Sequence, residues 1–235
     1  MSRARAYRRA QAGRRVGLDV TTRRAVPRPT RRTTTSTGAP MTEILVFHHV
    51  QGLTDGVRDF AARLAGDEHV VHVPDLYDGR LFDDIDAGIA HAQSLDRDEV
   101  GARVDAIADG LPADLVVAGF SWGAMHAQRL AQTRPGCRGA LLYEAFVALG
   151  AEWSFGPWPA GVRAQVHGMD ADPFFALEGD LDAARELVDV VGPEQAELFT
   201  YPGDTHLFTD SSLPQHDAAA TRLVIERSRA FLARA

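Results

Sequence analysis

The chain has 235 residues, 45% of them hydrophobic and 24% charged, which is typical of a globular protein long enough to bury a sizeable core. Its unbroken apolar runs are only a few residues long, far short of the roughly 20 that a membrane-spanning helix needs, so an embedded membrane protein is excluded. A single cysteine, Cys137, excludes an intramolecular disulfide framework and a zinc site built from cysteines. We expect a soluble cytoplasmic protein, a monomer or a homodimer, with no membrane partner.

The net charge of −7 is unevenly distributed along the chain. Residues 1–40 contain eleven arginines and one acid, whereas residues 41–235 contain fourteen arginines and 31 acids. Because phosphate groups repel a surface of their own sign, we expect no nucleic acid partner for the folded domain.

Residues 1–40 are rich in Arg and Thr and show no apolar period. Such a segment cannot bury enough surface to offset its chain entropy, so we predict a disordered N-terminal extension before a domain at 41–235. Three interpretations remain open: an organellar transit peptide, a nucleic-acid-binding arm, or an extension upstream of a natural start at Met41. We favour the last.

From residue 43 onward, short β-rich runs alternate with segments of helical period. Segments of helical period lie between these runs and after the last one, at about 54–66, 100–111, 124–133, 177–191 and 216–233. In the last two segments, Leu177 and Leu223 are expected on the apolar face. The predicted strands are 43–47, 69–73, 114–120, 139–143, 162–167 and 197–201. This alternation predicts an α/β fold with an open, mostly parallel sheet of about six or more strands and helices on both faces. In such sheets, reactive groups lie on the loops at the carboxyl ends of the strands.

The third predicted strand runs into Gly119-Phe120-Ser121-Trp122-Gly123, a G-x-S-x-G pattern followed by a helical segment. A sharp strand-to-helix turn of this kind holds the serine in a strained conformation with its hydroxyl projecting from the sheet. The helix N-terminus then offers the Trp122 N–H to a developing oxyanion. The pattern therefore predicts a serine nucleophile at Ser121.

A serine nucleophile needs a base, and the base needs an orienting carboxylate. In the α/β-hydrolase order of Ser, acid and His, the loops after the fifth and sixth strands supply Asp170 and His206. Asp172 is the main rival of Asp170, and we favour Asp170. The sequence thus predicts a Ser121–His206–Asp170 triad.

The chain resembles the dienelactone hydrolases, a family with the α/β-hydrolase fold, from about residue 43 to its C-terminus. The resemblance rests on the segments 47–53, 74–79, 119–123, 168–170 and 201–208. It implies that the protein hydrolyses an ester or lactone through an acyl-enzyme, and that the loop after the first strand gives a second oxyanion N–H, from Val50.

Three positions depart from this family's pattern. Members typically have a cysteine nucleophile where this chain has Ser121, and a glutamate where it has His49. The members that cleave dienelactone hold a substrate carboxylate with two arginines; here Asp210 stands at one of these positions, and Arg80 falls one residue from the other. We place His49, Arg80, Tyr143 and Asp210 at the substrate-binding surface, and expect neutral esters or lactones to be better substrates than anionic ones.

We therefore predict a serine hydrolase that acts on a small ester or lactone, with no cofactor and no metal. No nucleotide-binding glycine motif is present in the sequence. The alternative is a non-catalytic α/β-hydrolase-fold protein that binds a ligand.

Overall fold

The structure is a computed structural model that describes residues 41–152 and 154–235. The extension predicted at 1–40 lies outside the described residues, as does Trp153. The described helices are α2 (Asp55–Ala65), α3 (Ile85–Ser94), α4 (Arg97–Asp109), α5 (Trp122–Thr133), α6 (Asp180–Val191) and α7 (Ala218–Leu232). The strands are β1 (Glu43–Phe47), β2 (Val70–His72), β3 (Val116–Phe120), β4 (Gly139–Tyr143), β5 (Arg163–Met169) and β6 (Ala196–Tyr201).

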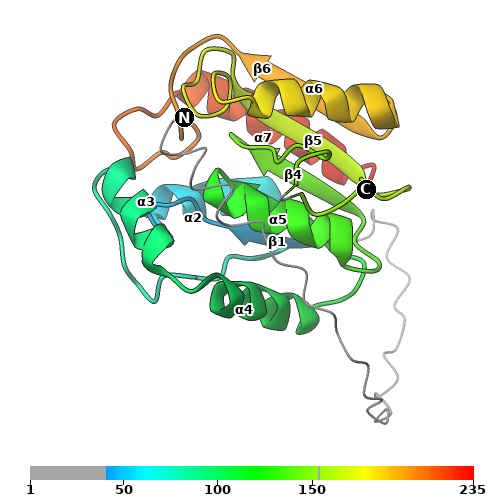
Figure 1. The fold of residues 1–235 in the computed structure, drawn as a ribbon, viewed down its shortest axis with the longest axis horizontal. Coiled ribbons are helices and arrows are strands. Elements are labelled where there is room, and N and C mark those ends of the chain that lie inside the picture. Colours follow the sequence, from blue (N-terminus) through cyan, green and yellow to red (C-terminus); the bar gives the residue numbers. More distant parts are fainter. Residues whose placement is uncertain (1–40, 153) are drawn as a thin grey trace.

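All six strands hydrogen-bond in parallel, in the order β2-β1-β3-β4-β5-β6. Helices cover both faces of this open sheet, with α5 and α6 on one side and α2 and α7 on the other (Figure 1). The predicted fold class, an open parallel α/β sheet of the α/β-hydrolase type, is therefore confirmed.

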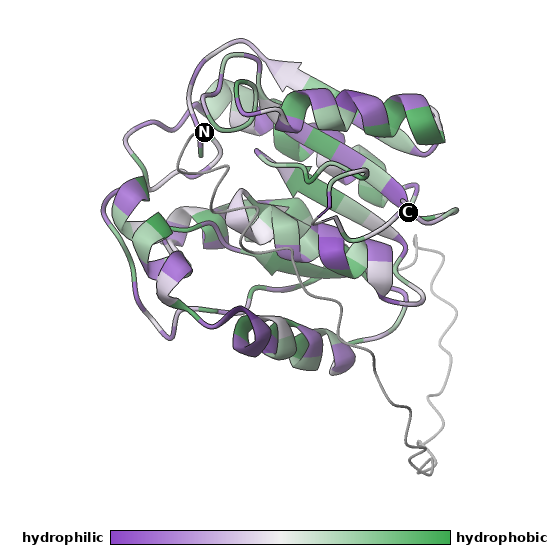
Figure 2. Cartoon of the chain, in the orientation of Figure 1, coloured by the Kyte–Doolittle hydropathy of each residue, from purple (hydrophilic) through white to green (hydrophobic). Residues whose placement is uncertain are grey.

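Alternating residues of each central strand enter two separate cores. In β1, Leu45 and Phe47 pack toward α5, whereas Ile44 and Val46 pack toward α2 and α7. Because both faces are covered, these strands are apolar at consecutive positions. Figure 2 shows the result, with mainly green strands inside and helices that mix green and purple.

Local signals place the ends of the elements. The Thr54 side chain caps α2 by accepting from the Val57 N–H, and Gly66 ends that helix with a φ of +54°. Among the described residues, no helix is long and apolar enough to cross a bilayer.

Three local expectations were wrong. Helix α3 was not predicted, because it buries only Gly88 and Ala92 and so lacks a clear apolar stripe. Leu177 precedes α6 rather than lying on its apolar face, and is 74% exposed. Leu223 lies in α7 but is 38% exposed.

Helix α5 lies close against the sheet because Gly119 and Gly123 have no side chains where the strand and the helix meet. A Cβ atom at Gly123 would overlap the backbone carbonyls of Phe47 and His48 at the end of β1, and one at Gly119 would overlap the Gly123 backbone. The glycines of the G-x-S-x-G pattern are therefore required by the close approach of strand and helix.

Substitution of Gly123 by alanine tests this constraint. We expect Gly123→Ala to lower the free energy of unfolding by about 2–4 kcal/mol, because backbone atoms must move to admit the methyl group. The matched control is Gly101→Ala in α4, where a Cβ meets nothing within 4 Å and helix propensity favours alanine by about 0.5–1 kcal/mol. Urea denaturation measures both variants, and equal stabilities would contradict the account.

Candidate active site

Ser121 occupies the turn between β3 and α5 in a backbone conformation that non-glycine residues rarely adopt, with a φ of +48°. Its backbone N–H donates to the Tyr143 carbonyl at 2.8 Å, and its carbonyl accepts from the Ala124 N–H at 3.0 Å. These bonds hold the strained turn in place, as the sequence pattern predicts.

His206 links Ser121 to a buried carboxylate. The His206 Nε2 atom lies 2.8 Å from Ser121 Oγ, and its Nδ1 atom lies 2.7 Å from Asp172 Oδ2. A carboxylate can only accept, so Nδ1 carries the imidazole proton and Nε2 is free to accept from the serine hydroxyl. The three residues come from loops after three different strands, β3, β5 and β6.

Asp172, not Asp170, occupies the acid position. Strand β5 was expected to end at residue 167 but continues to Met169, and the Asp170 N–H still bonds to the Tyr201 carbonyl beside the end of β6. Asp170 is exposed, and its carboxylate accepts from the Gly203 N–H at 3.1 Å instead. The preference for Asp170 was wrong because the strand is two residues longer than its apolar run indicates.

The Asp172 carboxylate is fully buried and fixed from both sides. Its Oδ1 accepts from the backbone N–H groups of Phe174 and Phe175, at 2.8 and 3.2 Å, so Oδ2 points at His206. Phe174 also packs on the His206 ring, with 4.6 Å between the ring centroids. The imidazole is thereby fixed in one orientation.

Ser121 lies on the wall of a pocket whose empty volume is about 400 Å³, a value that includes the solvent-filled space at its opening. Residues from α3, α5 and the strand-end loops line it: Val50, Ile85, Ile89, Ser121, Trp122, Met125, Glu144, Ala145, Phe174 and His206. Ile85 and Ile89 of α3 form part of its apolar wall, and Gly88 lets this helix approach the Val50 carbonyl closely. Val50 and Trp122, predicted to form the oxyanion hole, both lie on this pocket.

The other predicted substrate-binding residues do not line the pocket. Tyr143 is fully buried on the opposite face of the sheet, where its hydroxyl donates to Ser228 Oγ at 3.1 Å. Arg80 is an exposed residue of the loop before α3. These two assignments are corrected: the first side chain points away from the site, and the second is absent from the pocket wall.

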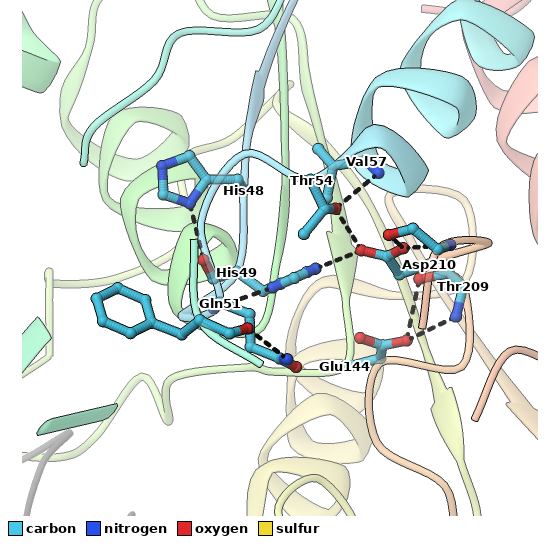
Figure 3. Close-up of polar contacts among 10 residues, drawn as sticks. His48, His49, Gln51, Thr54, Val57, Glu144, Thr209 and Asp210 are labelled. Carbon is cyan, nitrogen blue, oxygen red and sulfur yellow. Dashed lines mark hydrogen bonds and ion pairs between the residues drawn. The ribbon is translucent and has the colours of Figure 1, made fainter. Parts of the chain in front are cut away.

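His49 and Asp210 bond to each other beneath the site instead of binding substrate (Figure 3). The two side chains are 1% and 2% exposed, with 2.8 Å between His49 Nε2 and Asp210 Oδ2. Since His49 Nδ1 accepts from the Gln51 N–H at 3.2 Å, the ring proton is on Nε2 and is donated to Asp210. Neither residue lines the pocket, so the assignments of His49 and Asp210 to the substrate-binding surface are both corrected.

Asp210 is the acceptor of a small network. Besides His49, the hydroxyls of Thr54 and Ser212 donate to it, at 2.5 and 2.6 Å. Burial acts to raise the pKa of Asp210, but the bonds from His49, Ser212 and Thr54 outweigh it and hold the pKa at about 2. Burial lowers the pKa of His49, so the pair is a neutral imidazole donating to a carboxylate. The network ties the Val50 loop to the loop that carries His206.

Glu144 is a pocket residue that the sequence analysis missed. It directly follows β4, is 1% exposed, and lines the pocket with Ser121 and His206. Its position at the carboxyl end of a central strand is the signal that would have found it.

Among the described residues, no group of three or more His, Cys, Asp or Glu side chains is arranged to hold a metal ion.

Replacing Asp210 by asparagine tests the buried network. The carboxylate accepts from His49, from Thr54 and from both the N–H and the hydroxyl of Ser212. An asparagine NH₂ group would face some of these donors, so we expect Asp210→Asn to lower the free energy of unfolding by about 2–3 kcal/mol at pH 7. Since the folded-state pKa is depressed, this stabilisation exists above the unfolded-state pKa and is lost as pH falls through about 2.

Denaturation of wild type and variant across pH 2–7 measures the difference. Asp182→Asn, which removes an exposed partner of Arg185, is the control and should change stability by less than about 1 kcal/mol. An Asp210→Asn cost that stayed constant down to pH 2 would argue against a depressed pKa.

A family model supports what the geometry indicates. The model of the dienelactone hydrolase family matches residues 31–235. The comparison with curated proteins finds no significant match.

Several solved structures share the fold at low sequence identity. A putative dienelactone hydrolase from Klebsiella pneumoniae aligns with a TM-score of 0.67 and 19% identity over 85% of this chain and 90% of that one. The dienelactone hydrolase-like promiscuous phosphotriesterase P91 from metagenomic libraries gives 0.62 and 20%, over 84% and 88%. The esterase Est2 of Thermogutta terrifontis gives 0.61 and 16%, over 83% and 81%. At these identities the structural likeness establishes the fold alone.

Proposed function

Because the chain belongs to the dienelactone hydrolase family, and as such is a hydrolase of ester bonds, we propose that it cleaves a small ester or lactone through a Ser121–His206–Asp172 triad. The observation that carries the proposal is the unbroken hydrogen-bond chain from Asp172 through His206 to Ser121, which ends at the wall of a pocket. A buried carboxylate, an imidazole of fixed tautomer and a strained serine are the parts that acyl transfer requires.

The reaction would proceed in two halves. His206 Nε2 takes the Ser121 proton as Oγ attacks the scissile carbonyl, and the proton then passes to the departing alcohol oxygen as the C–O bond breaks. A water molecule then attacks the acyl-enzyme and gives its proton to His206 Nε2. This proton returns to Ser121 Oγ as the bond to the acyl group breaks and the carboxylic acid product leaves. Asp172 stabilises the imidazolium in both halves and keeps its own negative charge.

The oxyanion would be held by the backbone N–H groups of Val50 and Trp122. Trp122 is the first residue of α5, where N–H groups have no carbonyl partner within the helix. Among the described residues, the Val50 N–H donates to no backbone or side-chain acceptor. Two free donors on the pocket wall beside Ser121 support this assignment.

The remaining expectations about the protein's setting stay predictions. We retain a small-molecule substrate, a cytoplasmic location, a monomeric or homodimeric state and no nucleic acid partner for the folded domain. Cys137 is buried away from the pocket, and burial raises the pKa of its thiol, so it is not a rival nucleophile.

The nucleophile is tested by Ser121→Ala. We expect kcat toward a short 4-nitrophenyl ester to fall about 10⁴- to 10⁶-fold and labelling by a fluorophosphonate probe to vanish. Ser94→Ala, at an exposed position of α3, is the matched control and should be labelled like wild type. Wild-type protein that is never labelled, and a ligand affinity that Ser121→Ala leaves unchanged, would favour the non-catalytic binding protein.

The acid is tested by comparing Asp172→Asn with Asp170→Asn. An asparagine at 172 would face His206 Nδ1 without the carboxylate's charge and favour the wrong tautomer, so we expect kcat to fall about 10⁴-fold. Asp170→Asn removes an exposed acceptor of one backbone bond and should cost less than tenfold. Steady-state kinetics of the two variants would refute the assignment if Asp170→Asn had the larger effect.

The pocket should prefer neutral substrates. Asp172 lies behind His206, and among the described residues no arginine or lysine lines the pocket, so an anionic substrate approaches the Asp172 carboxylate without a matching positive charge. We expect kcat/KM for 4-nitrophenyl butyrate to exceed that for the similar-sized 4-nitrophenyl hydrogen succinate by about tenfold to a hundredfold. Faster turnover of the anionic ester would contradict this expectation.

A further inference from the structure

Glu144 has an unusual backbone conformation for its residue type. It directly follows β4 with a φ of +63°, and its N–H donates to the His167 carbonyl at 2.7 Å. Non-glycine residues adopt this region at a cost of about 1–2 kcal/mol, and such strain is concentrated at ligand-binding and catalytic positions. Glu144 lines the pocket that contains Ser121 and His206.

One oxygen of this carboxyl group is satisfied and the other is not. Oε1 accepts from the Thr209 N–H at 3.4 Å and from the Thr209 hydroxyl at 3.1 Å (Figure 3). Oε2 is buried and has no hydrogen-bond partner among the described residues. A buried polar atom without a partner destabilises the fold unless another group satisfies it, and Glu144 is one of the residues that line the substrate pocket.

Glu144 is not part of the hydrogen-bond chain that ends at the nucleophile. Within the described chain, its side-chain hydrogen bonds go to Thr209 and none goes to Ser121, His206 or Asp172. It therefore does not orient the base, and its free oxygen is available to the molecule that occupies the pocket.

Resting on the proposed function, we propose that Glu144 is a substrate-binding residue whose Oε2 donates a hydrogen bond to a second, neutral oxygen of the substrate. The substrate class is then an ester or lactone that carries a hydroxyl or keto oxygen in addition to its scissile carbonyl.

Burial favours the protonated form of this carboxyl group, and the donors from Thr209 decide which oxygen carries the proton. Since two Thr209 donors occupy Oε1, the proton belongs on Oε2, facing the pocket. Burial raises the pKa of Glu144 to about 7; His206 opposes the rise, Asp172 adds to it, and the bonds from Thr209 oppose it. His206 and Asp172 are the titratable groups that face Glu144. Below pH 7 the residue is a donor that adds no charge.

A matched pair of esters tests the inference. We would measure kcat/KM for 4-nitrophenyl 3-hydroxybutyrate and 4-nitrophenyl butyrate, and divide their ratio by the ratio of their alkaline hydrolysis rates. At pH 6 the wild-type ratio should be about ten or more, the effect of one hydrogen bond of about 1.4 kcal/mol. Because both substrates use the same His206, the titration of the base cancels in this ratio.

Two variants at position 144 test whether the preference depends on a hydrogen-bond donor at this position. Glu144→Leu removes the donor, and its ratio should fall to about one. Glu144→Gln keeps an oxygen for Thr209 and places an NH₂ donor toward the pocket, so its ratio should stay within about threefold of wild type. Glu197→Gln, the same chemical change on β6 outside the pocket, is the control and should keep the wild-type ratio.

The pH dependence gives a second readout that needs no folded Leu variant. The wild-type ratio should decline as pH rises from 6 to 8 and Glu144 loses its proton, whereas the Gln ratio should stay flat. A Leu variant that keeps the preference, a Gln variant that loses it, or a wild-type ratio that does not change with pH would each overturn the inference. Wild-type protein that hydrolyses neither ester and resists fluorophosphonate labelling would instead overturn the proposed function itself.

Discussion

The parallel direction of the sheet is the constraint on which the site depends. Because all six strands run the same way, every loop that follows a strand begins at one edge of the sheet. The strand-end loops there bring Ser121, Glu144, Asp172 and His206 together although they are far apart in sequence. The buried strands form a rigid base for these loops, and the loops need only short turns to aim their side chains.

Buried polar bonds, rather than apolar contacts alone, fix how these loops sit relative to one another. Asp172 is held by two backbone N–H groups, and His49 with Asp210 joins the loop after β1 to the loop after β6. His49 and Asp210 are two of the positions at which the chain departs from the family's usual residues. The structure places them in direct contact, where they form a buried pair that joins the two loops.

Much of the fold was predictable from the sequence because it depends on local signals. Consecutive apolar residues marked all six strands, Thr54 and Gly66 marked the ends of α2, and the glycines at 119 and 123 marked the nucleophile turn. The errors have a common physical origin in tertiary contacts. Strand β5 extends two residues beyond its apolar run by pairing with β6, so that Asp172 rather than Asp170 is the carboxylate that contacts His206.

The side-chain environments were harder to predict. Sequence spacing placed Asp210 close to His206, but only the packing of α2 against this loop buries its carboxylate under the site. Tyr143 and Glu144 are neighbours in the chain, yet the end of β4 directs one into the core and the other into the pocket. Helix α3 was not predicted from hydrophobic periodicity because its apolar stripe is weak, although it provides two residues of the pocket wall.

A crystal structure of the protein after reaction with a small fluorophosphonate tests the central claim most directly. The account predicts a covalent bond from phosphorus to Ser121 Oγ and a phosphoryl oxygen about 3 Å from the N–H groups of both Val50 and Trp122. It also predicts that His206 remains hydrogen-bonded to Asp172. An unmodified Ser121, an adduct oxygen turned away from both N–H groups, or a His206 that bonds to Asp170 instead would contradict it.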